Sequence, residues 1–157
     1  MNDPRYQRGL AKIYHSEVLG EMLFDTAARW SRISDHRMKW LKLKDLETQT
    51  KERLCAFLVA AGLQAHPSVM AKPFGRFYGA LLGYLPWPLS MWLLERGTRP
   101  YLKLFERLEQ DAGNEARAFF AYVTAHERAI AEFARRERKG QKGNSLIPVT
   151  KLLQGRY

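Results

Sequence analysis

Apolar side chains recur every three or four residues along almost the whole chain, and this period constrains the fold more than any other feature. In the first 33 residues the stripe passes through Leu10, Ile13, Phe24 and Ala28, and comparable stripes follow further along the chain. Apolar residues at this spacing line one face of an α-helix. Strands need a two-residue alternation, which is scarce here. The sequence therefore predicts an all-α protein.

The first two long helices have recognisable ends. We expect the first over residues 3–33. Ser34 or Asp35 would then cap a second helix, whose stripe includes Trp40 and Leu43. Gly62 is a typical C-terminal stop.

The second pair of long helices is predicted in the same way. Gly97 indicates a stop, and Thr98 would begin the third helix, with Pro100 tolerated in its first turn. That helix ends near Gly113. Asn114 would cap a fourth helix over residues 115–139.

Residues 77–94 form an 18-residue stretch without a charge, FYGALLGYLPWPLSMWLL. Its length reaches the threshold for a membrane span, but Pro86 and Pro88 interrupt any helix at its middle. We therefore expect two short apolar helices around a proline turn, in a segment of about 74–94 that links the second and third long helices.

This apolar segment has two interpretations. Gly75, Gly79 and Gly83 recur every four residues, which lets one helix face approach a neighbour closely. In that case the segment is a buried crossover within a bundle. Alternatively it lies on a membrane surface as a monotopic hairpin, with its aromatic residues at the headgroup boundary, namely Tyr84, Trp87 and Trp92.

The 157 residues suit one domain. We expect a four-helix bundle over residues 1–139, with its apolar crossover at about 74–94, and a basic tail over residues 140–157 with a short helix after Pro148. Four long helices with one long connection are the elements of such a bundle.

The single cysteine and the N-terminal sequence bear on location. Cys55 alone excludes a disulfide framework and a cysteine-built zinc site, and its position beside Phe57 suggests a small core residue. No apolar signal segment follows the polar N-terminus. We expect a cytoplasmic protein, with a peripheral position on the inner face of the membrane if the apolar segment binds lipid.

The formal net charge is +10, from 26 basic and 16 acidic residues. Such a balance favours acidic partners, which include anionic lipid, acidic proteins and nucleic acid. The basic runs carry interleaved acids, as solvated helix faces do. Nucleic-acid binding therefore rests on net charge alone and is the third of the functions we consider.

Four polar residues interrupt the apolar stripes: Glu17 and Glu21 on the first, Glu47 on the second and His126 on the fourth. A carboxylate that faces a helical core is unfavourable unless it is paired, protonated or bound to metal. Carboxylates and an imidazole converging from different helices are the means by which bundles hold iron or manganese. Ordinary hydrogen bonding in the core, or pairing at the edge of the stripe, is the alternative for each residue.

A weak internal repeat sharpens the metal hypothesis. Di-iron bundles carry Glu on one helix and Glu-x-x-His on the next, twice over. The first half of this chain has Glu17 and then Glu47, with Thr50 where the histidine would stand. The second half has Glu95 and then His126, with Val123 where the glutamate would stand.

On these residues the chain resembles the ferritin-like superfamily, and within it the demethoxyubiquinone hydroxylases, which are di-iron carboxylate enzymes. The resemblance spans about residues 10–138 and is carried by YHSEVLGEMLF (14–24), LKLKDLETQTKERL (41–54), GALLGYLPWPLSMWLLE (79–95) and AHERAIAEF (125–133). It implies a ferritin-like bundle, an iron cofactor, and an apolar segment that associates with the membrane where a quinone resides.

Carried over residue by residue, the resemblance implies that Glu17, Glu47, Glu95 and His126 are metal ligands, with Glu106 or Glu109 as alternatives to Glu95. A standard di-iron site uses six ligands, and Thr50 and Val123 cannot replace the missing donors. A one-metal site, a rearranged site that recruits Glu21, Glu127 or His15, and a metal-free relative are all compatible with this pattern.

Two functions from different classes follow. The first is a metal-dependent oxidoreductase of the di-iron monooxygenase type, which acts on a lipophilic, quinone-like substrate at the membrane surface. The second is a non-catalytic bundle that has lost its metal and serves as a binding or interaction protein, with a homodimer as one arrangement. Metal content separates the two, so the assignment as an enzyme depends on it.

Overall fold

The computed structural model describes residues 4–63 and 69–156, and in this part of the chain every regular element is a helix. The all-α prediction is therefore confirmed. The elements are α1 (Pro4–Trp30), α2 (Ser34–Ala60), α3 (Ala71–Tyr84), α4 (Trp87–Asp111), α5 (Asn114–Arg138), a 3₁₀ turn (Lys142–Asn144) and α6 (Ile147–Leu153).

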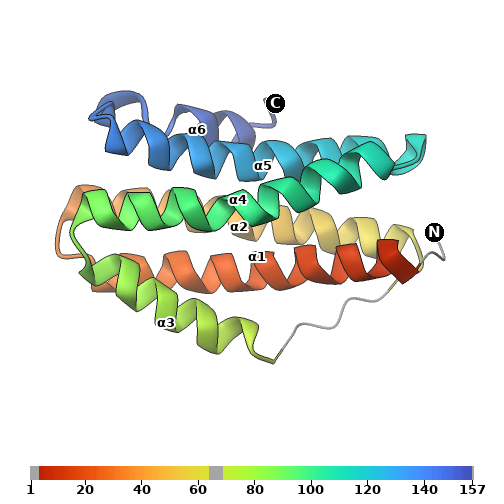
Figure 1. Ribbon diagram of the computed structural model, residues 1–157, viewed down its shortest axis with the longest axis horizontal. Coiled ribbons are helices and arrows are strands. Elements are labelled where there is room, and N and C mark those ends of the chain that lie inside the picture. The colour runs from red at the N-terminus through yellow and green to blue at the C-terminus, as the bar shows by residue number, and fades with distance from the viewer. Residues whose placement is uncertain (1–3, 64–68, 157) are drawn as a thin grey trace.

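The four long helices, α1, α2, α4 and α5, lie alongside one another as a helical bundle (Figure 1). Consecutive helices pack as pairs, α1 against α2 and α4 against α5, and α2 also contacts α5. Their apolar stripes meet in one core, which buries large side chains completely, among them Trp40, Met91, Phe105, Phe120 and Phe133. The stripe residues that predicted α1, such as Ile13 and Phe24, belong to this core.

Helix α4 differs from the prediction. It runs without interruption through Gly97, Thr98 and Pro100, so the expected stop at Gly97 is wrong. Proline removes one backbone hydrogen bond, to the carbonyl four residues earlier. That carbonyl belongs to Arg96, which is exposed, so water can satisfy it. Buried residues before and after the proline, Leu94 and Phe105, hold the helix together through packing.

Two helix starts are also displaced. Helix α2 includes Ser34, and Ile33 occupies its N-cap position without a side-chain bond. Helix α5 includes Asn114, with Gly113 at its N-cap. The chain enters both helices one residue earlier than the capping residues suggested. Cys55 is exposed, so its predicted place in the core is also wrong.

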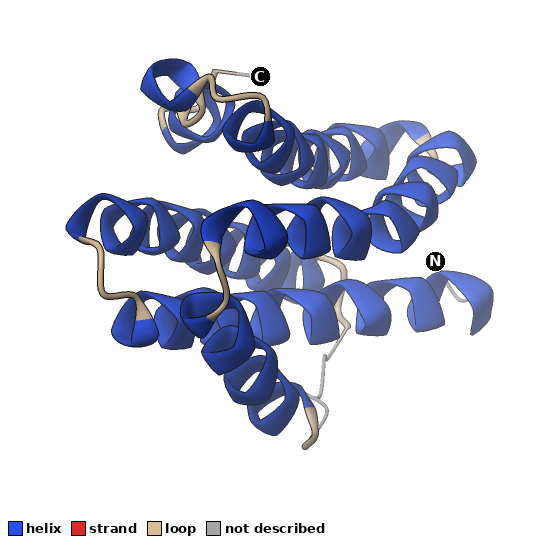
Figure 2. Ribbon diagram, turned by 60° about the vertical axis from the view of Figure 1, so that its left-hand side comes forward, coloured by secondary structure: helices blue, strands red, loops and turns tan. Residues whose placement is uncertain are grey.

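Helix α3 crosses the outer side of α1, as two views show (Figures 1 and 2). Its three glycines form the contact. A Cβ at Gly75 would lie 2.6 Å from the Leu19 carbonyl oxygen, and one at Gly83 would lie 2.6 Å from the Ala27 carbonyl oxygen. The close approach predicted from the glycine spacing is confirmed, and the partner is α1.

The proline turn falls where the apolar segment predicted it, at Leu85–Pro86, but the residues after it begin the long helix α4 rather than a separate short helix. Among the described residues, no helix is both long enough and apolar enough to cross a bilayer.

The C-terminal segment packs on the bundle. Helix α6 contacts α5 and α2, and its residues Val149 and Leu152 are buried in the common core. The short helix predicted there exists, beginning at Ile147, one residue before Pro148.

Candidate metal centre and apolar cavity

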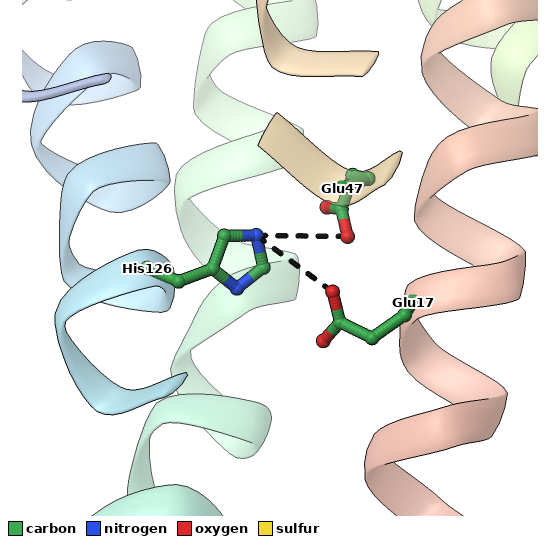
Figure 3. Close-up of side chains that lie close together, drawn as sticks. All are labelled: Glu17, Glu47 and His126. Atoms are coloured by element: carbon green, nitrogen blue, oxygen red, sulfur yellow. Dashed lines mark ion pairs between the residues drawn. The ribbon is translucent and has the colours of Figure 1, made fainter. Parts of the chain in front are cut away.

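Three helices bring Glu17, Glu47 and His126 together in the middle of the bundle (Figure 3). Glu17 comes from α1, Glu47 from α2 and His126 from α5, and their side chains point toward one another. One ligand atom from each lies within 4.8 Å of the others. The His126 Nε2 atom is 3.6 Å from Glu47 Oε2 and 3.9 Å from Glu17 Oε2. We refer to these residues as the Glu–Glu–His group.

The group is buried, and three of its polar atoms lack hydrogen-bond partners among the described residues. His126 and Glu17 are each 1% exposed and Glu47 is 5% exposed. Within the described part of the chain, Glu17 Oε2 and both ring nitrogens of His126 have no hydrogen-bond partner. Buried polar atoms are almost always satisfied in native proteins. Glu17 Oε2 and His126 Nε2, which face each other at 3.9 Å without a hydrogen bond, therefore indicate a place for a cation.

Burial sets the protonation states of the group. Loss of solvation raises the pKa of Glu17 to about 7 and raises the pKa of Glu47 well above its usual range, with the neighbouring Glu17 charge adding to the shift of Glu47. Burial also lowers the pKa of His126 to about 3. The imidazole is therefore neutral at physiological pH, which is the form that binds metal.

Gly20 leaves room for the side chain of Glu47 beside α1. It lies on α1 one turn after Glu17, and a Cβ there would be 2.5 Å from both the carboxyl carbon and Oε1 of Glu47. Only glycine lets the α2 carboxylate lie against the α1 backbone. The prediction from sequence missed this residue, although a glycine inside a helix, three positions after a ligand, was a usable signal.

A cavity of about 400 Å³ adjoins the group. Glu17 and Glu47 form part of its wall, and most of the remaining lining is apolar, from α1, α3, α4 and α5. On its α3 side, Tyr78 and Leu81 are exposed. The cavity therefore opens at the surface between α3 and α4. The lining residues beyond the two carboxylates and α3 include Leu19, Leu23, Phe24, Leu93, Leu94, Thr98, Tyr101, Glu127 and Ile130.

Two further polar side chains reach this cavity. Glu127, next to His126 on α5, is 7% exposed, and burial raises its pKa well above the usual range, with the Glu17 charge contributing. Tyr101 on α4 is half-buried, and burial together with the nearby Glu127 raises its pKa. Both shifts favour the protonated form, which can donate a hydrogen bond into the cavity.

The predicted ligand Glu95 lies apart from the group. It is on α4, as expected, but its carboxylate pairs with Arg138 and, at 3.6 Å, with Arg99.

The three additional donors predicted from the sequence, Glu21, His15 and Glu127, lie in different surroundings. Glu21 accepts a hydrogen bond of 2.7 Å from Thr48 and pairs with Lys51, which lowers its pKa against the opposing effect of partial burial. His15 is half-buried and outside the group. Of the predicted additional donors, only Glu127 reaches the cavity.

Trp87 is half-buried and its side chain is held by contacts within the bundle. Its Nε1 donates a 2.7 Å hydrogen bond to Glu137 Oε2, and its ring stacks on His36. Glu137 in turn pairs with the buried Lys39 at 2.8 Å. Tyr84 and Trp92 are exposed, as predicted.

Comparison of the chain with protein-family models, with curated proteins and with solved structures found no match. Its function is therefore inferred from the chemistry of the Glu–Glu–His group and the adjoining cavity.

Proposed function

We propose that this protein is a ferritin-like, metal-dependent oxidoreductase that binds iron at Glu17, Glu47 and His126 and acts on a lipophilic, quinone-like substrate at a membrane surface. The observation that supports this most is the position of the Glu–Glu–His group. Its unpartnered ligand atoms lie beside an apolar cavity that opens to the outside.

The donor set suits iron. Carboxylate oxygens and a neutral imidazole nitrogen are the donors of iron and manganese sites in helical bundles. Ligands bonded at about 2.1 Å to one ion lie about 3.0 to 4.2 Å apart, and the two distances from His126 Nε2, 3.6 and 3.9 Å, fall in this range. Bound iron would supply the redox chemistry for reaction of dioxygen with an organic substrate.

The cavity suits a compact apolar guest with an oxygen atom. Its volume of about 400 Å³ is within the range of small-molecule sites, about 300–1,000 Å³. The Tyr101 hydroxyl, and Glu127 in its protonated form, can donate hydrogen bonds to a carbonyl or hydroxyl oxygen of the guest, and the leucines of the wall exclude water. These donors would orient the substrate toward the Glu–Glu–His group.

The outer surface around the mouth of the cavity has the composition of a membrane-binding surface. Five exposed residues of α3 form what we call the aromatic face: Phe74, Phe77, Tyr78, Leu81 and Tyr84. The only charged residues of α3 are Lys72 and Arg76, both basic and exposed. Apolar side chains flanked by cations are typical of helices that lie on anionic membranes. A substrate dissolved in lipid would then meet the mouth directly.

Metal content tests the proposal. We expect protein reconstituted anaerobically with Fe(II) to retain iron through gel filtration, as measured by elemental analysis. A Glu47→Ala/His126→Ala variant should lose it while its far-ultraviolet circular dichroism stays helical. Iron bound equally by the variant would place it elsewhere. Absence of iron from the wild-type protein would contradict the oxidoreductase and favour the alternative, a non-catalytic binding protein built around the same cavity.

A further inference from the structure

We infer that this centre binds a single divalent cation, and that a hydrogen-bonded Thr50–Tyr122 pair closes the place of a second one. The inference rests on the proposed metal function and specifies it further. A two-metal centre needs a second set of donors beside the first, with the ions about 3.5–4 Å apart.

The two positions that would supply those donors lie on the same side of the group. Thr50 follows Glu47 by one turn of α2, and Val123 precedes His126 by one turn of α5. These helices run in opposite directions (Figure 1). Both residues are fully buried. The hydroxyls of Thr50 and Tyr122 are 3.0 Å apart, which confirms that these turns of α2 and α5 face each other.

The space between these turns is filled. Thr50 also donates a 2.9 Å hydrogen bond to the Leu46 carbonyl, so its hydroxyl is engaged on two sides. Thr50, Tyr122 and Val123 are absent from the cavity wall, which includes Glu17 and Glu47. This cavity therefore lies on the side of the group away from the Thr50–Tyr122 pair.

Electrostatics also opposes a second ion here. The guanidinium of Arg53 lies 4.2 Å from the centre of the Tyr122 ring, which places a permanent positive charge behind this pair. The glutamate expected from α4, Glu95, is held by Arg138 and Arg99 instead.

The charge balance of the Glu–Glu–His group also favours one cation over two. Glu17 and Glu47 carry two negative charges when both are ionised, and an imidazole binds metal in its neutral form. One divalent cation leaves the buried group neutral, whereas two would leave a net charge of +2, or +1 if Glu127 also ionised. An uncompensated buried charge is strongly unfavourable. The residues present therefore fit one cation and do not fit two.

The stoichiometry of Mn(II), measured by elemental analysis and electron paramagnetic resonance, tests the inference. We expect one Mn(II) per wild-type chain, with the uncoupled six-line spectrum of an isolated ion, and loss of this ion in Glu47→Gln. Two ions per chain with a coupled spectrum would overturn the inference and leave the proposed metal function intact. No bound ion would overturn both.

A gain-of-site variant provides the second arm. Thr50→His/Val123→Glu restores both missing donors, and we expect it to bind two Mn(II) per chain. Thr50→Val is the matched control, because it removes the bond to Tyr122 without adding a donor, and it should still bind one. Two ions in Thr50→Val would also overturn the inference. Because the wild-type measurement decides the count by itself, the test does not depend on the double variant folding.

Discussion

At the scale of single residues, Gly20 is important because it has no Cβ, which leaves room for the Glu47 carboxylate beside α1. A methyl group there would fall 2.5 Å from the Glu47 carboxyl group, so the carboxylate would have to leave α1. We predict that Gly20→Ala weakens Mn(II) binding about tenfold or more, as changes in the support of a metal ligand typically do. Titration followed by electron paramagnetic resonance measures this.

Gly97→Ala is the matched control for that variant. Gly97 also lies within a helix and lines the same cavity, but a Cβ there would meet nothing within 4 Å. We expect unchanged Mn(II) affinity and a gain in stability of up to about 1 kcal/mol from helix propensity. Equal effects of the two substitutions on Mn(II) affinity would contradict the role assigned to Gly20.

The protonation of the buried group predicts an unusual pH dependence of the metal-free protein. The pKa of Glu17 rises from 4.5 to about 7 on folding, and those of Glu47 and Glu127 also rise, so the folded state retains protons that the unfolded state releases. Its free energy of unfolding should therefore fall as pH rises above about 5, by about 1.4 kcal/mol per pH unit for each retained proton.

His126 opposes this trend only at lower pH. Its pKa falls from 6.5 to about 3, so it makes the protein more stable as pH rises through that interval and has no effect above it. Urea unfolding of the wild-type protein and of Glu17→Gln in the presence of a chelator, between pH 5 and 7, isolates the Glu17 carboxyl group, because the His126 contribution is common to both proteins. Glu17→Gln should reduce the fall in stability over this range. An equal pH dependence of the two proteins would contradict the assignment.

At the scale of the helices, α3 depends on its glycine contact with α1. A Cβ at Gly79 would overlap the Leu23 carbonyl oxygen and crowd the Thr26 side chain. Backbone atoms cannot move aside cheaply, so we predict that Gly79→Ala destabilises the protein by about 1–3 kcal/mol. Hydrogen exchange should show faster exchange confined mainly to α3. Uniform loss of protection over all helices would contradict this local effect.

A buried ion pair links α2 and α5 where α4 begins. Lys39 and Glu137 have side chains that are 4% and 0% exposed, and Glu137 also accepts the Trp87 indole hydrogen bond. We predict that Glu137→Gln costs about 3 kcal/mol of stability, because Lys39 would keep its charge with one partner fewer. Glu132→Gln, which breaks ion pairs at the surface, should cost about 1 kcal/mol or less by urea unfolding.

These elements show what the sequence could predict and where it could not. The helical period located α1, α2, α5 and the second half of α4, because each has one apolar face, and the glycine spacing indicated a close helix contact. The continuity of α4 could not be predicted, since packing on both sides of Pro100 outweighs the local preference to break. Lys39 and Glu137 resembled members of charged surface runs, and only the tertiary arrangement identifies them as buried partners.

The candidate site was also predictable only in part. Glu17, Glu47 and His126 were identifiable because each interrupts an apolar stripe, and the structure brings these three together. Glu95 was not separable from them by spacing, since its pairing with Arg138 bridges residues far apart in the chain. The cavity, and the place of Glu127 in its wall, depend on how five helices pack together, which no local pattern encodes.

At the scale of the whole molecule, the net charge and the aromatic face predict a combined mode of membrane binding. We expect co-sedimentation with vesicles containing phosphatidylserine. High salt should weaken it but not abolish it, because apolar burial persists when charges are screened. Phe77→Ser/Tyr84→Ser should reduce binding about tenfold or more. Both side chains are largely exposed, so the fold should be retained.

Met38→Ser/Val59→Ser is the control, because it removes two exposed apolar residues of α2, away from the aromatic face. Equal loss of vesicle binding by the two double variants would show that the aromatic face is not the contact. Tight retention on RNA or DNA at low salt, together with no vesicle binding, would favour the nucleic-acid interpretation of the charge.

The opening of the cavity between α3 and α4, beside the aromatic face, has a kinetic consequence. If the aromatic face rests on a bilayer, a guest reaches the mouth by lateral diffusion in two dimensions. Occupancy of the cavity would then follow the mole fraction of the guest in the lipid, whatever its total concentration in the sample. Adding inert lipid, with the amounts of guest and protein held constant, should slow turnover because the guest is diluted in the membrane surface. Adding buffer should leave the rate per membrane-bound protein unchanged.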